Sequence, residues 1–171
     1  MKLILLIEEG KNYGQIPIVD ENGKTYFFLQ GKLHNINHTL FLKDYHNHEL
    51  GRLYLDQRNL INKYVIDLVD GNLGQVHQLS HLEFPMLLRP NNYLITGSTK
   101  KGSYHFRSAF KEIAECQTMI TKKGQAIVCD IININDIPYV LLITGLFSQW
   151  NTTMIKLPDL QLNKGQLTTD Y

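Results

Sequence analysis

Residues Ile16-Pro17-Ile18-Val19-Asp20-Glu21-Asn22-Gly23-Lys24-Thr25-Tyr26-Phe27-Phe28-Leu29 indicate two alternating strands joined by a turn. Asn-Gly tolerates the positive φ angles that a two-residue type I′ turn requires at both central positions. With Asn22-Gly23 as that loop, Glu21 faces Lys24 and Val19 faces Tyr26, which are favourable cross-strand pairs. This stretch therefore predicts an antiparallel hairpin.

The same alternation continues on both sides of this hairpin. The opening residues, 1–7, indicate a first strand, since their apolar run is too short for a secretory signal. Many short strands divided by turns are typical of an all-β sandwich or barrel. Asp20 and Asp44 each end a strand before a turn, which is a weak internal repeat of 24 residues. Four further strand pairs are expected, at 39–44 with 50–55, 64–69 with 73–76, 92–96 with 103–107, and 113–118 with 126–131.

The turn of the last pair sets its register. A turn centred on Lys122-Lys123 places Cys116 opposite Cys129, with small residues facing large ones. A centre at Lys123-Gly124 would instead place Cys116 opposite Ile131. We expect the first register, with both cysteines as thiols, because disulfides are rare in the cytoplasm.

The pattern changes after residue 134. Asn135 precedes Pro138, which is typical of a capped helix start. Residues 139–150 are then apolar on almost every side, so the predicted helix should be enclosed in the core. It is too short to cross a bilayer, so no transmembrane span is expected.

Composition limits the organisation and the partners. The 171 residues predict one domain over 1–150, with its helix near 137–150, followed by a polar tail at 151–171. A net charge of +1 offers no broad positive field, so nucleic acid is not an expected partner. With two cysteines in the chain, the expected location is cytoplasmic, with peripheral membrane attachment as an option.

The arrangement of short strands, early turns beginning with Asp, and one late apolar helix resembles the tubby-like superfamily. The resemblance is strongest to its LURP-one-related branch and small bacterial relatives. It implies a mainly β fold, a closed antiparallel barrel of about twelve strands around the helix. It also implies a non-enzymatic protein, since some members bind phosphoinositides and related scramblases act at membranes. The resemblance covers about 16–150 and is carried by residues 19–24, 27–32, 42–44, 49–50, 93–97 and 139–150.

Motifs for catalysis or metal binding are missing from the sequence. His46 with His48, and His77 with His81, have ligand-like spacing but no cysteine or His-Glu-x-x-His run beside them. Surface histidines are the simpler interpretation, and we expect no metal and no cofactor. Nucleophile elbows and phosphate loops are also absent.

Four residues allow a second interpretation. Cys116 with His105 would suit a thiol enzyme, although alternation favours Cys116 as a buried apolar residue. Asp67 and Asp130 lie between apolar strand residues, where each is either a buried site or an outward position; alternation favours the outward position.

The basic residues gather near one strand pair. Alternation turns Tyr104 and Phe106 inward and leaves Arg107 outward, between Lys100-Lys101 and Lys111. We therefore expect an anion or lipid surface at Lys100, Lys101, Arg107 and Lys111, with a solvated turn as the alternative. Lys122 and Lys123 follow in the next turn.

These observations favour a non-enzymatic binding or regulatory domain. Its expected partner is an anionic membrane phospholipid headgroup or another protein. The alternative is an enzyme or transport-accessory protein with a ligand pocket at the barrel mouth.

Overall fold

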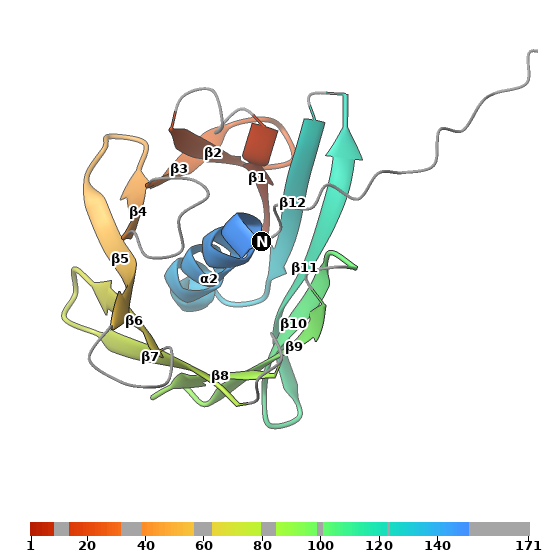
Figure 1. Cartoon of the computed structure of the whole chain (residues 1–171). Helices are drawn as coiled ribbons and strands as arrows, with labels where there is room; N and C mark the ends of the chain where they lie inside the picture. The colour runs from red at the N-terminus through yellow and green to blue at the C-terminus, as the bar shows by residue number, and fades with distance from the viewer. Residues whose placement is uncertain are drawn as a thin grey trace, which may run out of the picture.

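Twelve antiparallel strands form a closed barrel around one helix (Figure 1). The computed structural model describes residues 1–8, 14–31, 39–56, 63–79, 85–98, 101–122 and 124–150. Each strand pairs with its sequence neighbours, and β1 closes the barrel by pairing with β12 as well as β2. The expected fold class is confirmed. The strands are β1 (Lys2–Leu6), β2 (Gln15–Val19), β3 (Thr25–Gln30), β4 (Leu40–Asp44), β5 (Glu49–Asp56), β6 (Lys63–Leu68), β7 (Leu73–Gln78), β8 (Met86–Arg89), β9 (Tyr93–Ser98), β10 (Ser103–Ser108), β11 (Lys111–Thr121) and β12 (Gly124–Ile131).

The helix α2 (Ile137–Trp150) fills the barrel and supplies much of its core. Leu142, Ile143, Leu146 and Phe147 are at most 2% exposed, as the apolar pattern predicted. Gly145 lets the helix approach the wall, because a Cβ atom there would lie 2.8 Å from Leu29 Cδ1. Among the described residues, no helix is long and apolar enough to cross a bilayer.

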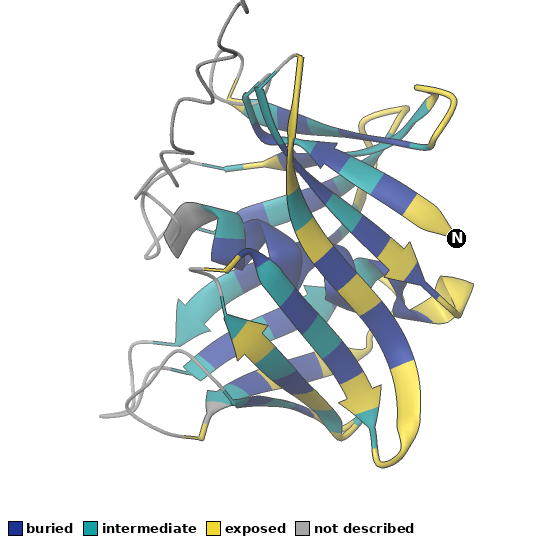
Figure 2. Ribbon diagram, turned by 90° about the vertical axis from the view of Figure 1, so that its right-hand side faces the viewer, coloured by how far each residue is buried: buried dark blue, intermediate teal, exposed yellow. Residues whose placement is uncertain are grey.

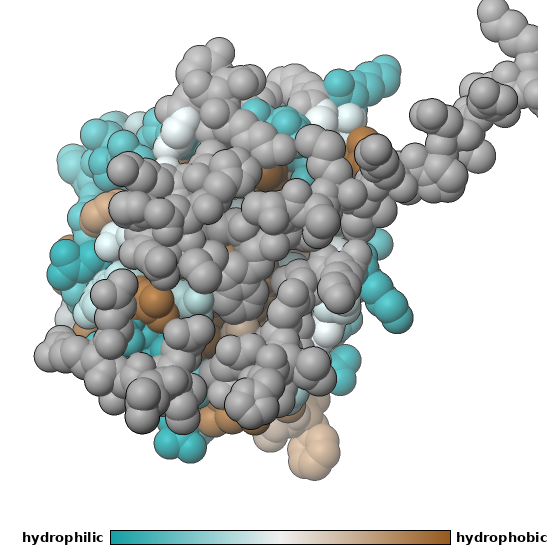
Figure 3. Space-filling view, viewed as in Figure 1, coloured by the Kyte–Doolittle hydropathy of each residue, from teal (hydrophilic) through white to brown (hydrophobic). Residues whose placement is uncertain are grey.

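Buried residues alternate with more exposed ones along the strands, as the colours of Figure 2 show. On β10, Tyr104 and Phe106 are buried, whereas His105 is intermediate and Arg107 is exposed. The described residues that are visible around the edge of the molecule in Figure 3 are mainly hydrophilic. Period-two alternation therefore separates an apolar interior from a polar wall.

The first hairpin departs from the predicted type I′ register. Val19 pairs with Thr25, not Tyr26, after a register shift between Ile18 and Val19. The turn is longer than two residues, because Asp20 N donates to the Lys24 carbonyl and the Asp20 carboxylate accepts from Lys24 N. The positive φ of +81° falls on Gly23. Glu21 pairs with Lys2 at 3.0 Å instead of with Lys24.

The same turn recurs at 24-residue spacing. Asp20 N bonds to the Lys24 carbonyl, Asp44 N to the His48 carbonyl, and Leu68 N to the Asn72 carbonyl. The residue at the fourth position of each turn has positive φ, at Gly23, Asn47 and Gly71. The weak repeat seen between Asp20 and Asp44 thus corresponds to three equivalent hairpin turns.

The start of the helix also differs from the prediction. A 3₁₀ turn, η1 (Ile134–Asp136), precedes α2, so Asn135 is not its cap. The Asn133 side chain caps η1 by accepting from Asn135 N at 3.1 Å. The expected tail at 151–171 lies outside the described residues.

Candidate functional site

The barrel has two ends with different elements. At the first end, here called the barrel mouth, lie Met1, the turns after β2, β4, β6, β8 and β10, η1, and the start of α2. This end is at the right of Figure 2, where the N-terminus is marked. The turns after β9 and β11 lie at the opposite end with the last turn of α2.

A pocket of about 980 Å³ opens at the barrel mouth. It is formed by the β6–β7 and β8–β9 turns, the β10–β11 hairpin, η1 and the first turn of α2. Four asparagines, two carboxylates, two tyrosines, a serine and a lysine give it a polar lining. Its polar lining residues are Asp70, Asn72, Asn91, Tyr93, Ser108, Lys111, Asn133, Asn135, Asp136 and Tyr139.

Two carboxylates in this pocket already have hydrogen-bond donors. The Tyr93 hydroxyl donates to Asp136 Oδ1 at 2.8 Å, and Asp136 is 6% exposed. The Asp70 carboxylate accepts from the Asn72 backbone N at 3.0 Å and from Asn72 Nδ2 at 2.7 Å. These bonds orient the two carboxylates, the Tyr93 hydroxyl and the Asn72 amide.

The two tyrosines of the pocket have raised pKa values. Burial, followed by the hydrogen bond and charge of Asp136, raises the pKa of Tyr93 to about 12. Burial and the charges of Asp70 and Asp136 also raise the pKa of Tyr139. Both phenols therefore remain protonated donors at neutral pH. The described lining residues include no histidine or cysteine, and the pocket is built for hydrogen bonding.

Exposed apolar residues lie next to lining residues of this polar pocket. Phe110, at the tip of the β10–β11 turn, is fully exposed beside the lining residue Lys111. Val69, Leu73 and Ile132 each adjoin a lining residue in sequence, and Ile134 lines the pocket itself. All four are more than half exposed. The barrel mouth thus combines a polar centre with an apolar rim.

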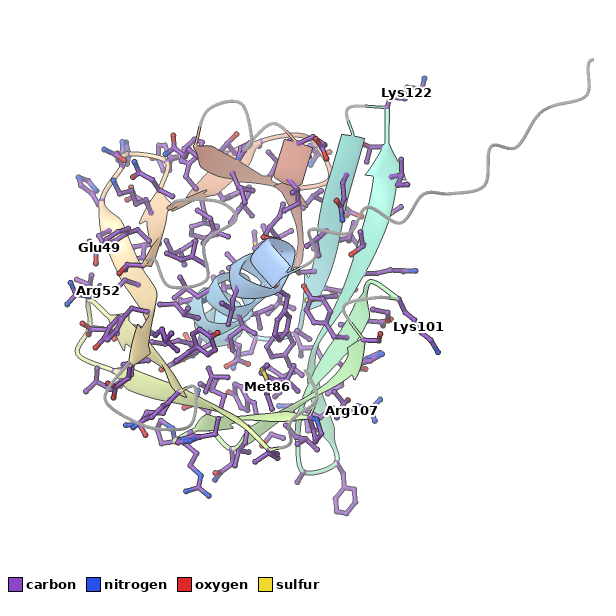
Figure 4. All side chains as sticks on the ribbon, viewed as in Figure 1. Glu49, Arg52, Met86, Lys101, Arg107 and Lys122 are labelled. Atoms are coloured by element: carbon purple, nitrogen blue, oxygen red, sulfur yellow. The ribbon has the colours of Figure 1, made fainter. Side chains whose placement is uncertain are left out.

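The structure divides the predicted basic surface between the two ends. Lys101 lies in the turn before β10, whereas Arg107 and Lys111 lie where β10 ends and β11 begins. Six strand residues separate these places, which is roughly 20 Å. Lys101 and Lys111 therefore do not converge on one anion, and Lys100 lies outside the described residues. Figure 4 shows Lys101, Arg107 and Lys122 pointing outward at separate places.

The thiol-enzyme hypothesis fails on geometry. Cys116 faces inward and is fully buried, whereas His105 lies on the outer face of the wall. Asp67 and Asp130 follow the alternation: Asp67 Oδ2 lies 2.7 Å from Arg52 Nη2 on the outer wall, and Asp130 is exposed.

His46, His48 and His77 are not among the lining residues of the pocket. His46 and His48 lie in the exposed β4–β5 turn, where His48 Nδ1 lies 3.1 Å from Asp44 Oδ2. His77 is on β7, where burial and then Lys63 and Arg89 lower its pKa. His81 lies outside the described residues. A different group, His105 with Glu112 and Glu115, gathers three ligand atoms within 4.8 Å of one another.

Comparison with solved structures identifies the fold. An X-ray structure of the Arabidopsis thaliana protein AT5G01750 matches with a TM-score of 0.60, over 88% of this chain and 90% of that one. The fold is tubby-like. Sequence identity in that match is 15%, so the similarity concerns architecture alone. No protein-family model and no curated protein matches the chain.

Proposed function

We propose that this protein is a non-enzymatic binding domain of the LURP-one-related branch that docks its barrel mouth on an anionic phospholipid surface. The observation that carries the proposal is the β10–β11 turn. Phe110 is fully exposed at its tip, between the cationic residues Arg107 and Lys111. An aromatic tip with basic flanks suits the interface between headgroups and acyl chains.

The energetics favour a weak and reversible contact. Moving one large apolar side chain out of water is worth about 1.5–3 kcal/mol. A basic residue near an anionic membrane adds about 1 kcal/mol at physiological salt, and this gain is screened as salt increases. Val69, Ile132 and Ile134 add apolar surface at the same end of the barrel. Docking there would fit a peripheral protein at the cytoplasmic leaflet, which carries the anionic lipids.

The polar pocket limits what enters it. Lys111 and the asparagine amides are donors for a headgroup phosphate, whereas Asp70 and Asp136 repel a second negative charge. Binding should therefore depend on the whole rim and should not rest on one strong anion site.

Liposome co-sedimentation tests this proposal. Vesicles of phosphatidylcholine with or without phosphatidylserine are mixed with wild type, Phe110→Ala, and an Arg107→Glu/Lys111→Glu double variant, at low and high salt. A Lys101→Glu/Lys122→Glu variant is the matched control, since both lysines lie at the opposite end. We expect salt-sensitive binding to phosphatidylserine vesicles that both mouth variants lose and the control retains.

Three results would contradict membrane docking at the mouth. They are absence of vesicle binding by wild type, equal binding by all variants, and loss only in the opposite-end control. Absence of binding would favour a protein partner or a small molecule in the mouth pocket. The 980 Å³ volume of that pocket supports the small-molecule alternative, which includes a transport-accessory role.

A further inference from the structure

The outer wall of the β10–β11 hairpin gathers three side chains that can bind metals. His105 points outward because Tyr104 and Phe106 on either side of it are buried. Glu115 is the direct register partner of His105. Both side chains therefore lie on the same outer face of adjacent strands.

A bulge brings the third side chain to this face. The pairing shifts between Phe106 and Arg107, so that Arg107 pairs with Glu112 instead of Ile113. Ile113 and Ala114 are consecutive and both buried, which breaks the period of two. Glu112 consequently shares the outer face with Glu115 although the two are three residues apart.

The distances suit a metal ion. His105 Nδ1 lies 3.1 Å from Glu112 Oε1, and the ligand atoms of all three residues lie within 4.8 Å of one another. Ligand atoms around tetrahedral zinc are about 3.3 Å apart, given bond lengths of about 2.0–2.1 Å. Because Glu115 is exposed, its side chain has room to rotate toward an ion held by the other two residues.

We propose that His105, Glu112 and Glu115 form a binding site for a divalent first-row transition-metal ion. One imidazole nitrogen and two carboxylate oxygens match the preferences of zinc, iron and manganese more closely than those of calcium or magnesium, which take oxygen ligands alone. The two carboxylates balance the charge of the ion, and water completes its coordination.

Neighbouring charges modulate the site. Asp130 is the register partner of Glu115 on β12 and adds negative charge, while Lys2 faces Asp130 from β1. Arg107 is the register partner of Glu112 and adds positive charge beside it.

Calorimetric titration of the full chain with zinc chloride tests the site, with magnesium chloride as the comparison. The variants are His105→Ala and Glu112→Gln. The control is His48→Ala, since His48 Nδ1 also lies 3.1 Å from a carboxylate oxygen, that of Asp44, in an exposed turn. We expect wild type to bind one equivalent at His105, with affinity reduced at least tenfold in both site variants and unchanged in the control.

Ring-nitrogen NMR spectra distinguish this site from other histidines in the chain. Zinc should shift the His105 ring signals in wild type and in His48→Ala. The proposal is overturned if millimolar zinc leaves the His105 signals unmoved, or if His105→Ala binds the same equivalent with unchanged affinity. Circular dichroism of each variant confirms that the barrel is folded in every titration.

Discussion

Cys116 lies directly opposite Cys129 across β11 and β12, and their sulfur atoms lie 3.6 Å and 3.7 Å from the same hydroxyl, that of Thr144. Both thiols are free and fully buried, and Thr144 is a buried polar residue of α2. Burial, and then the neighbouring Cys129, raise the pKa of the Cys116 thiol. The cysteine pair therefore packs the helix against the barrel wall.

Thiol reactivity should report this burial. Reagents attack accessible thiolates, so neither cysteine of the folded protein should react with Ellman's reagent at pH 8, and both should react in guanidinium chloride. Gln117→Cys is the matched control. Gln117 is the next residue after the buried Cys116 and is exposed, so a cysteine introduced there should react at once. Rapid reaction of one or two thiols in the folded wild type would contradict the enclosed arrangement.

Replacing the helix core by a charge should unfold the barrel. Leu142 is fully buried, so Leu142→Asp leaves an unpaired carboxylate in the core, at a cost of several kcal/mol. Leu142→Ala should instead lower the free energy of unfolding by about 2–5 kcal/mol and still fold. Ile120→Asp, at an exposed position on β11, is the control and should change stability little. Urea unfolding followed by circular dichroism measures all three, and a cooperatively folded Leu142→Asp would refute the enclosed helix.

The Tyr93–Asp136 pair should be visible in alkaline titration. The pKa of Tyr93 is raised to about 12, chiefly by burial and then by Asp136. Because the pKa of Tyr93 is higher in the folded state than in the unfolded state, protonated Tyr93 stabilises the fold. This contribution to the free energy of unfolding is fully present below the unfolded-state pKa near 10, and it is lost as pH rises through about 12. Carbon-13 NMR of the tyrosine rings, assigned with Tyr93→Phe, measures this titration.

Asp136→Asn separates the two causes of that shift. Because the variant removes the carboxylate charge but leaves burial, the pKa of Tyr93 should fall toward 10 without reaching it. A wild-type Tyr93 that titrates near 10, or an Asp136→Asn protein with an unchanged value, would show that the two side chains do not interact as described.

Local sequence patterns were sufficient for the periodic parts of the fold. Alternation correctly turned Tyr104 and Phe106 inward, and the apolar run after Pro138 correctly predicted an enclosed helix. The β11–β12 register followed from its turn, which placed Cys116 opposite Cys129. These features depend on neighbours in sequence, where side-chain period and turn chemistry act directly.

The same reasoning failed where a bulge intervened. The shift at Val19 moved its partner from Tyr26 to Thr25, and the shift beside Arg107 turned Glu112 onto the face of His105. One extra residue reverses which side of a strand the following side chains occupy. Strict alternation along the strand therefore did not predict that Glu112 lies beside His105 and Glu115 in the proposed metal site.

The positions of the basic residues and of the mouth pocket could be determined only from the closed barrel. Lys101 and Lys111 are ten positions apart in sequence, yet β10 carries them to opposite ends. Conversely, closure of the barrel brings Asp70, Tyr93, Lys111 and Asp136 into one pocket from four separate segments. Sequence patterns specify which face a residue occupies, because that depends on local geometry. Which segments share an end of the barrel depends on the pairing of all twelve strands and on the helix that fills them.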